Sequence, residues 1–127
     1  MNVGTHYLVS QDGAIIELLP TTIMGRHTIG FNHVSISIEN VATSASELTT
    51  EQIQANVDLI RYLTHKHPSI RYLIGHHEYM LRTAPHFALY LAKDESYNST
   101  IKIDPGFRFM RLVRSELFRR YQIRLDR

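Results

Sequence analysis

The sequence predicts an α/β fold in which helices flank a mixed central β-sheet. Three observations indicate this class: an Asp-Gly hairpin signal near the start, a stretch with period-two alternation, and a capped amphipathic helix followed by a short apolar run. The 127 residues suffice for one hydrophobic core but not for two. We therefore expect a single domain over residues 1–127.

The first predicted unit is a β-hairpin. Residues 6–19 read as two strands around Asp12-Gly13, because glycine accepts the positive φ that tight hairpin turns require. Pro20 ends the second strand. Residues 24–33 are rich in glycine and histidine without a clear period, which is typical of a loop.

The next strand is predicted at residues 34–39, where apolar and polar side chains alternate. The alternation places the apolar members on one face of the strand and the polar members on the other. Val34, Ile36 and Ile38 form the first face, and Ser35, Ser37 and Glu39 form the second.

A helix follows, opened by a capping box of Thr49 and Gln52 and stopped by Pro68. Ile53, Val57 and Ile60 recur at helical spacing and form its apolar face. Residues 70–75 then read as a compact apolar strand. The order strand, helix, strand predicts that residues 34–39 and 70–75 pair in parallel.

Two predicted segments complete the chain. Residues 82–101 show no sustained period, which indicates a long connection with a role as a functional loop or lid. A final helix begins after Gly106. Its expected apolar stripe consists of Phe107, Met110, Leu112 or Val113, and Leu117.

Composition narrows the function classes. Hydrophobic residues make up 43% and charged residues 20%, and no apolar run approaches the length of a membrane span, so we expect no membrane insertion. Seven arginines lie in the last twenty positions, which fits either a solvated helix face or contact with an anionic surface such as nucleic acid or a cell-wall polymer. Because no motif for reading nucleic-acid grooves is present, we expect no nucleic-acid partner. With no cysteine, a metal would be held by imidazole and carboxylate.

Four residues are candidates for chemistry. His76 follows a predicted strand, and sites in open α/β sheets gather at the carboxyl ends of strands. Asp104 lies in an Asp-Pro-Gly turn with Lys102 two residues earlier, and Glu39 ends the alternating strand. Each also has a structural interpretation: a hydrogen-bonded histidine, a turn-capping aspartate, a surface lysine and a solvated glutamate. His77 should project away from His76, because neighbouring strand residues alternate.

Five stretches in order resemble the zinc-dependent N-acetylmuramoyl-L-alanine amidases, the family that includes phage lysozyme-type amidases and peptidoglycan recognition proteins. The stretches are His6-Tyr7-Leu-Val-x-x-Asp-Gly, Gly25-Arg26-His27-Thr28-x-Gly-Phe31-Asn32, Ser35-Ile36-Ser37-Ile38-Glu39, Ile74-Gly75-His76 and Lys102-x-Asp104-Pro-Gly. The resemblance implies hydrolysis of the amide between N-acetylmuramic acid and L-alanine in peptidoglycan. The alternative is a module that binds peptidoglycan fragments without cutting them.

The resemblance also implies roles for individual residues. His76 and Asp104 would be zinc ligands, Glu39 the general base, Lys102 the group that stabilises the oxyanion, and His6, His27 and Asn32 part of the substrate groove. In the family a further zinc histidine lies on a strand before the His-Tyr stretch. We therefore expect an N-terminally incomplete amidase-like fold, with replacement of that ligand by His6 as a minor alternative.

No signal peptide is recognisable at the N-terminus. The resemblance implies action on the bacterial cell wall, either as a phage or prophage lysin or as an exported enzyme.

Overall fold

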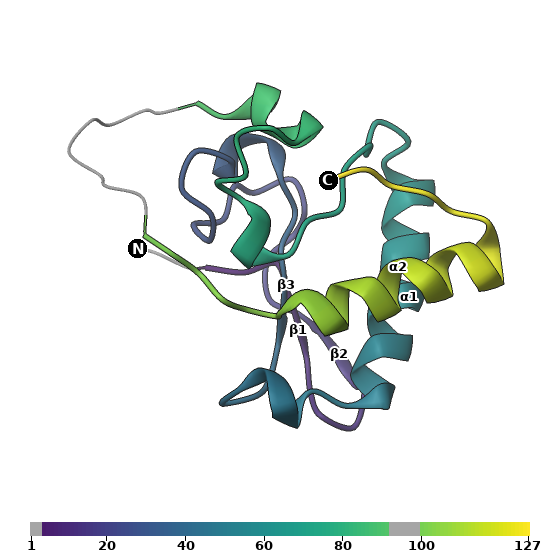
Figure 1. Cartoon of the computed structure of the whole chain (residues 1–127). Helices are drawn as coiled ribbons and strands as arrows, with labels where there is room; N and C mark the ends of the chain where they lie inside the picture. Colours follow the sequence, from purple (N-terminus) through teal and green to yellow (C-terminus); the bar gives the residue numbers. More distant parts are fainter. Residues whose placement is uncertain (1–3, 92–99) are drawn as a thin grey trace.

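The structure is a computed structural model that describes residues 4–91 and 100–127. In these residues a three-stranded sheet with the order β2-β1-β3 lies beside two α-helices (Figure 1). The strands are β1 (Tyr7–Val9), β2 (Ile15–Glu17) and β3 (Ile38–Asn40). One strand pair is antiparallel and the other parallel, so the predicted mixed sheet of an α/β fold is confirmed.

The predicted hairpin is present. β1 and β2 pair antiparallel, with Tyr7 opposite Glu17 and Val9 opposite Ile15. The turn between them has Gly13 at φ 89°, a conformation that favours glycine. The Gly13 N–H donates to the Ser10 carbonyl at 2.9 Å, which closes the turn. The local sequence was therefore sufficient to specify this unit.

β3 pairs in parallel with β1, with Tyr7 opposite Ile38. The predicted start of this strand at residue 34 is wrong, because Asn32–Val34 form a short 3-10 helix, η1, and Val34 is 50% exposed. Ile38 packs against the core as the alternation predicted. The error arises because alternation alone does not show where sheet pairing begins.

Helix α1 spans Thr50–Lys66 and has the predicted capping box. The Gln52 N–H donates to Thr49 Oγ1 at 3.1 Å, and the Thr49 N–H donates to Gln52 Oε1 at 2.9 Å. The fully buried Gln52 amide also donates to the carbonyls of Val9 and Val41. The start of α1 is thereby tied to the ends of β1 and β3.

Residues 70–75 do not join the sheet, which corrects the predicted strand and its parallel pairing with residues 34–39. They run extended beside the C-terminal residues instead. The Leu73 N–H donates to the Asp126 carbonyl at 2.8 Å, and the Asp126 N–H donates to the Arg71 carbonyl at 3.1 Å. A short apolar run signals burial but does not identify its hydrogen-bond partner, and here that partner is the end of the chain.

Helix α2 spans Phe107–Tyr121 and crosses α1 (Figure 1). The predicted helix is confirmed, but Phe107 is wrong as a core residue, because it is 66% exposed. The core between the helices consists of buried Ile53, Val57, Ile60, Phe109, Met110, Val113 and Leu117. The sequence left open whether Leu112 or Val113 belongs to the apolar stripe, and the structure buries Val113.

The described part of the predicted loop 82–101 contains a 3-10 helix, η4 (Pro85–Leu89). Phe87 and Tyr90 stack at 4.9 Å between ring centroids, and both rings contact the buried Phe31. Residues 92–99 of that prediction lie outside the described residues. Within the described part of the chain, none of the helices has the length and apolar character to span a membrane.

Candidate active site

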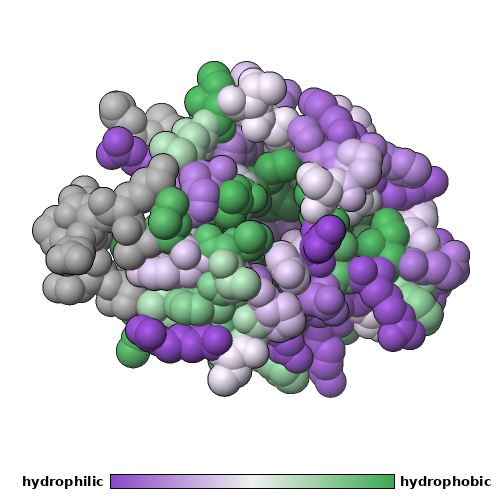
Figure 2. All heavy atoms as spheres, turned by 90° about the horizontal axis from the view of Figure 1, so that it is seen from above, coloured by the Kyte–Doolittle hydropathy of each residue, from purple (hydrophilic) through white to green (hydrophobic). Residues whose placement is uncertain are grey.

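A groove of about 1020 Å³ collects most of the predicted site residues. Its lining includes β3, residues 69–76 and apolar side chains of both helices, among them Ile60 and Met110. Figure 2 shows hydrophobic side chains inside a hollow on the face seen from above. The predicted site residues in the lining are His6, His27, Asn32, Glu39, His76 and Asp104.

His76 and Asp104 approach each other directly. His76 Nδ1 lies 3.4 Å from Asp104 Oδ2, although the two residues come from different segments of the chain. The His76 side chain is 25% exposed and the Asp104 side chain 68%, so the pair is open to solvent. An imidazole and a carboxylate that converge in this way are donor types that zinc accepts.

His76 is the first residue of a short 3-10 helix, η3 (His76–Glu78), and not the end of a strand. The predicted alternation of His76 and His77 therefore does not apply. The His77 N–H donates to the Asp104 carbonyl at 2.9 Å, and its ring Nδ1 lies 3.3 Å from the same oxygen. Both histidines thus lie next to Asp104, His76 at the carboxylate and His77 at the backbone.

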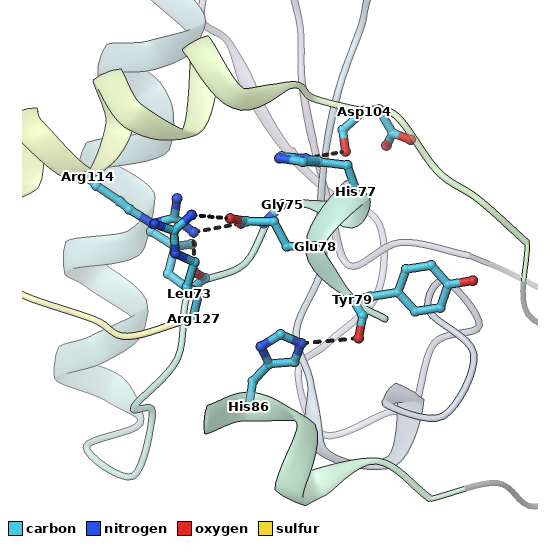
Figure 3. Close-up of polar contacts among 9 residues, drawn as sticks. All are labelled: Leu73, Gly75, His77, Glu78, Tyr79, His86, Asp104, Arg114 and Arg127. Atoms are coloured by element: carbon cyan, nitrogen blue, oxygen red, sulfur yellow. Dashed lines mark hydrogen bonds and ion pairs between the residues drawn. The ribbon is translucent and has the colours of Figure 1, made fainter. Parts of the chain in front are cut away.

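Glu78 is a buried acid in this turn that sequence reasoning missed. Its carboxylate points toward Arg114 and Arg127 (Figure 3). Burial would raise the pKa of Glu78, but hydrogen bonds from Arg114, the Gly75 N–H and Arg127 outweigh it and hold the pKa at about 2. The arginines lie 36 and 49 residues further along the chain, so no local pattern could have revealed these contacts.

Lys102 lies in an extended, exposed segment that runs from Thr100 to Asp104. The Thr100 N–H donates to the Tyr79 hydroxyl at 3.0 Å, and the Asp104 carbonyl accepts from His77, so both ends of the segment are tied to the turn that begins at His76. The Lys102 side chain does not belong to the groove lining of the described residues. The structure thus brings Asp104, rather than Lys102, to His76.

Glu39 lies in the middle of β3, opposite Leu8 of β1, and is exposed to the groove. The neighbouring Asn40 accepts a hydrogen bond from the Asn56 amide at 2.6 Å, which ties β3 to α1. The backbone at Glu39 therefore has a defined position beside the groove, and the exposed carboxylate has access to water.

His6 is buried, with 1% of its surface exposed, and both ring nitrogens have partners inside the protein. The Ser37 N–H donates to Nδ1 at 3.2 Å, and Nε2 lies 2.7 Å from the Ile23 carbonyl. Because Nδ1 accepts, Nε2 carries the proton and donates to that carbonyl. His6 thus links the start of β1 to Ser37, which precedes β3, and to Ile23, which lies in the groove lining.

His27 contributes an imidazole to the groove. Asn32 holds the loop in place, because its Oδ1 accepts from the His27 N–H at 2.9 Å and from the Thr28 N–H at 2.8 Å. The His27 ring packs edge-on against His6 at 5.6 Å, and its buried Nε2 has no hydrogen-bond partner among the described residues. Burial first, and then the electrostatic interaction with His6 and His76, lowers the pKa of His27 to about 4. The ring is therefore neutral at neutral pH.

The donor set fits a zinc ion in part. His76 and Asp104 converge, but residues 4–91 and 100–127 contain no group of three His, Cys, Asp or Glu side chains that could hold a metal. A catalytic zinc site usually has three protein ligands.

Comparisons with known proteins place these residues in context. A family model described as N-acetylmuramoyl-L-alanine amidase matches residues 1–106. Peptidoglycan recognition protein 3 of Homo sapiens is 31% identical over 96 residues, which cover 70% of this chain and 27% of that protein. The chain thus spans little more than a quarter of that relative. N-acetylmuramoyl-L-alanine amidase LysC from Clostridium intestinale URNW matches in structure with a TM-score of 0.49 and 29% identity, over 51% of this chain and 44% of that one.

Proposed function

The chain belongs to the N-acetylmuramoyl-L-alanine amidase family, and from this premise we propose that it hydrolyses the amide bond between N-acetylmuramic acid and L-alanine in peptidoglycan. The observation that carries the proposal is the approach of His76 Nδ1 to Asp104 Oδ2, at 3.4 Å, beside a groove of about 1020 Å³. Glu39 and His27 line the same groove. An extended polymer strand requires an open groove of this kind rather than a closed pocket.

We assign His76 and Asp104 as two ligands of a zinc ion. Zinc bound by such residues supplies a Lewis acid and lowers the pKa of water to about 7. The described residues contain no third ligand in reach, and we propose that it comes from a residue outside them, in line with the strand that the family resemblance puts before His6. A site formed by His76 and Asp104 alone should bind zinc weakly.

Glu39 is our proposed general base. Its carboxylate is exposed in the groove, where it can accept a proton from the attacking water and pass it to the leaving amine. An accessible carboxylate on a strand that is paired with β1 suits this task.

The remaining roles concern the substrate. The ammonium group of Lys102 would counter negative charge that develops on the carbonyl oxygen, which requires its exposed side chain to extend toward the groove. The neutral His27 ring lines the groove and would contact the glycan or peptide there. Asn32 would hold the His27 loop in place by hydrogen bonds, and the His6 ring would pack against the His27 ring.

The test is direct. The protein is incubated with purified muropeptides with and without added zinc, and the products are separated by liquid chromatography with mass detection. We expect cleavage that leaves a free lactyl end on the sugar and a free L-alanine amine, and dependence of this cleavage on zinc. Cleavage at another bond, or equal rates for the parent and Glu39→Ala, would refute the assignment.

A second candidate is a binding module that recognises peptidoglycan without cutting it. Two observations favour it: the described residues bring together two metal-ligating side chains rather than three, and a relative with 31% identity is named a recognition protein. The two candidates differ in zinc content. Stoichiometric zinc with cleavage supports the amidase, whereas muropeptide binding without zinc or cleavage supports the binding module.

A further inference from the structure

One buried carboxylate, that of Glu78, bonds to the backbone of the turn that carries His76. Glu78 is 6% exposed, and its Oε1 accepts from the Gly75 N–H at 2.8 Å and from Arg114 Nη2 at 2.7 Å. Its Oε2 accepts from Arg127 Nη1 at 2.9 Å (Figure 3). Gly75 and Glu78 are both close neighbours of His76 in the turn, and both arginines bond directly to Glu78.

Both arginines come from the C-terminal part of the chain. Arg114 lies on α2, and its Nη2 also donates to the Leu73 carbonyl at 2.9 Å. Arg127 follows the residues that pair with the segment before the turn, where the Leu73 N–H donates to the Asp126 carbonyl. The match to the family model ends at residue 106, so both arginines lie outside the matched region.

The backbone of the turn is also closely packed at Gly75. A Cβ atom at Gly75 would lie 2.6 Å from His77 Cε1 and 2.9 Å from Met110 Cγ, which shows how closely the backbone is packed. On its far side the His77 N–H is bonded to the Asp104 carbonyl at 2.9 Å. The position of His76 relative to Asp104 is therefore set by Glu78 on one side and by this backbone bond on the other.

We propose that Glu78 is a positioning residue which, held by Arg114 and Arg127, keeps the turn in the geometry that brings His76 Nδ1 to the Asp104 carboxylate. The inference rests on the proposed function, in which His76 and Asp104 lie at the reaction centre. It gives two of the seven C-terminal arginines a specific task, in place of a solvated face or an anionic surface.

The experiment compares Arg127→Ala, Arg127→Lys and Glu78→Gln in the whole chain. The matched control is Arg119→Ala, which removes an ion pair of similar length from the same C-terminal region, at 2.6 Å, whose partner is Glu116 of α2 rather than a residue of the turn. The first readout is the set of His76 ring signals and the His77 amide exchange rate by NMR. The second is kcat and KM for muropeptide cleavage.

Arg127→Ala should shift the His76 ring signals, speed exchange of the His77 amide and lower kcat by about 10- to 100-fold with little change in KM, as for other partners that orient a metal ligand. Arg127→Lys, which keeps the charge, should restore part of each effect. Glu78→Gln keeps an oxygen for Gly75 and Arg114 but presents an N–H₂ group to Arg127, so it should act in the same direction. Arg119→Ala should resemble the parent.

Folded Arg127→Ala protein with His76 signals and His77 exchange like those of the parent would overturn the inference. So would an equal effect of Arg119→Ala. If Glu78→Gln does not fold, Arg127→Ala and Arg127→Lys decide the matter. If the parent does not cleave muropeptides, the proposed function fails, while the NMR readout still tests the positioning role.

Discussion

The imidazole of His76 faces the carboxylate of Asp104, with 3.4 Å between Nδ1 and Oδ2. Neither side chain is held there by the other alone. His76 lies on a turn fixed by Glu78, and Asp104 is fixed by the backbone bond from His77. The pair therefore depends on two segments, each of which is held by other contacts.

His76→Ala and Asp104→Ala should each weaken zinc binding by more than the roughly 10- to 100-fold typical of losing an outer partner, because each removes a proposed ligand. His77→Ala is the matched variant, since its ring nitrogen lies next to the Asp104 backbone carbonyl rather than the carboxylate, and its effect should be smaller. Calorimetric titration with zinc measures the affinities. A larger loss in His77→Ala than in His76→Ala would reverse the assignment.

Glu39→Gln should lower kcat for muropeptide cleavage by about 10²- to 10⁴-fold, because a neutral amide does not accept the proton of the attacking water. Zinc content should not change. Glu17→Gln serves as the control, since Glu17 is an exposed glutamate on β2 of the same sheet and does not line the groove. A rate for Glu39→Gln equal to that for Glu17→Gln would remove Glu39 from the mechanism.

His27 should remain neutral down to about pH 4 in the folded protein, measured by NMR titration of its ring in the presence of a chelator. The unfolded chain takes up this proton near the ordinary pKa of 6.5, so the contribution of His27 to stability is full above pH 6.5 and is lost as the pH falls toward 4. His27→Asn should weaken this pH dependence of the free energy of unfolding. A His27 titration midpoint near 6.5 would contradict the prediction.

Asn32→Ala should loosen the His27 loop, because two backbone N–H groups lose the oxygen that accepts from them. Leaving a donor without a partner costs about 1–3 kcal/mol where it is buried. We expect faster exchange of the His27 and Thr28 amides and a higher KM for muropeptides. Asn32→Asp keeps an acceptor in the same place and should change both quantities less than the alanine variant does.

Gly75→Ala should destabilise the protein by about 1–3 kcal/mol, the usual range for overpacking, since the new Cβ would lie 2.6 Å from His77 Cε1. Gly4→Ala is the matched control, because the nearest atom to its Cβ is 3.5 Å away, and we expect a change of about 0.5 kcal/mol or less. Thermal unfolding of both variants provides the comparison. Equal stability would show that the turn can accommodate a side chain.

Elements with a signal inside a few neighbouring residues were predictable. The hairpin at Gly13 and the capping box of Thr49 and Gln52 depend on contacts between residues close in sequence, and the apolar stripe of α1 shows in the helical period of the sequence. The pairing of residues 70–75 was not predictable, because an apolar run fits a sheet or a C-terminal segment equally well. Phe107 failed as a core residue for a related reason, since helical spacing does not fix where the buried face begins.

The sequence by itself determined the α/β class, the helices, the family resemblance and the residue types for the site, including His76 and Asp104. The tertiary structure decided that these two meet and that His77 contacts the Asp104 backbone. It also decided that Glu78 accepts hydrogen bonds from arginines 36 and 49 residues away. The physical reason is range. Turns, caps and helical faces are set by local backbone chemistry, whereas the approach of two segments depends on how the whole core packs.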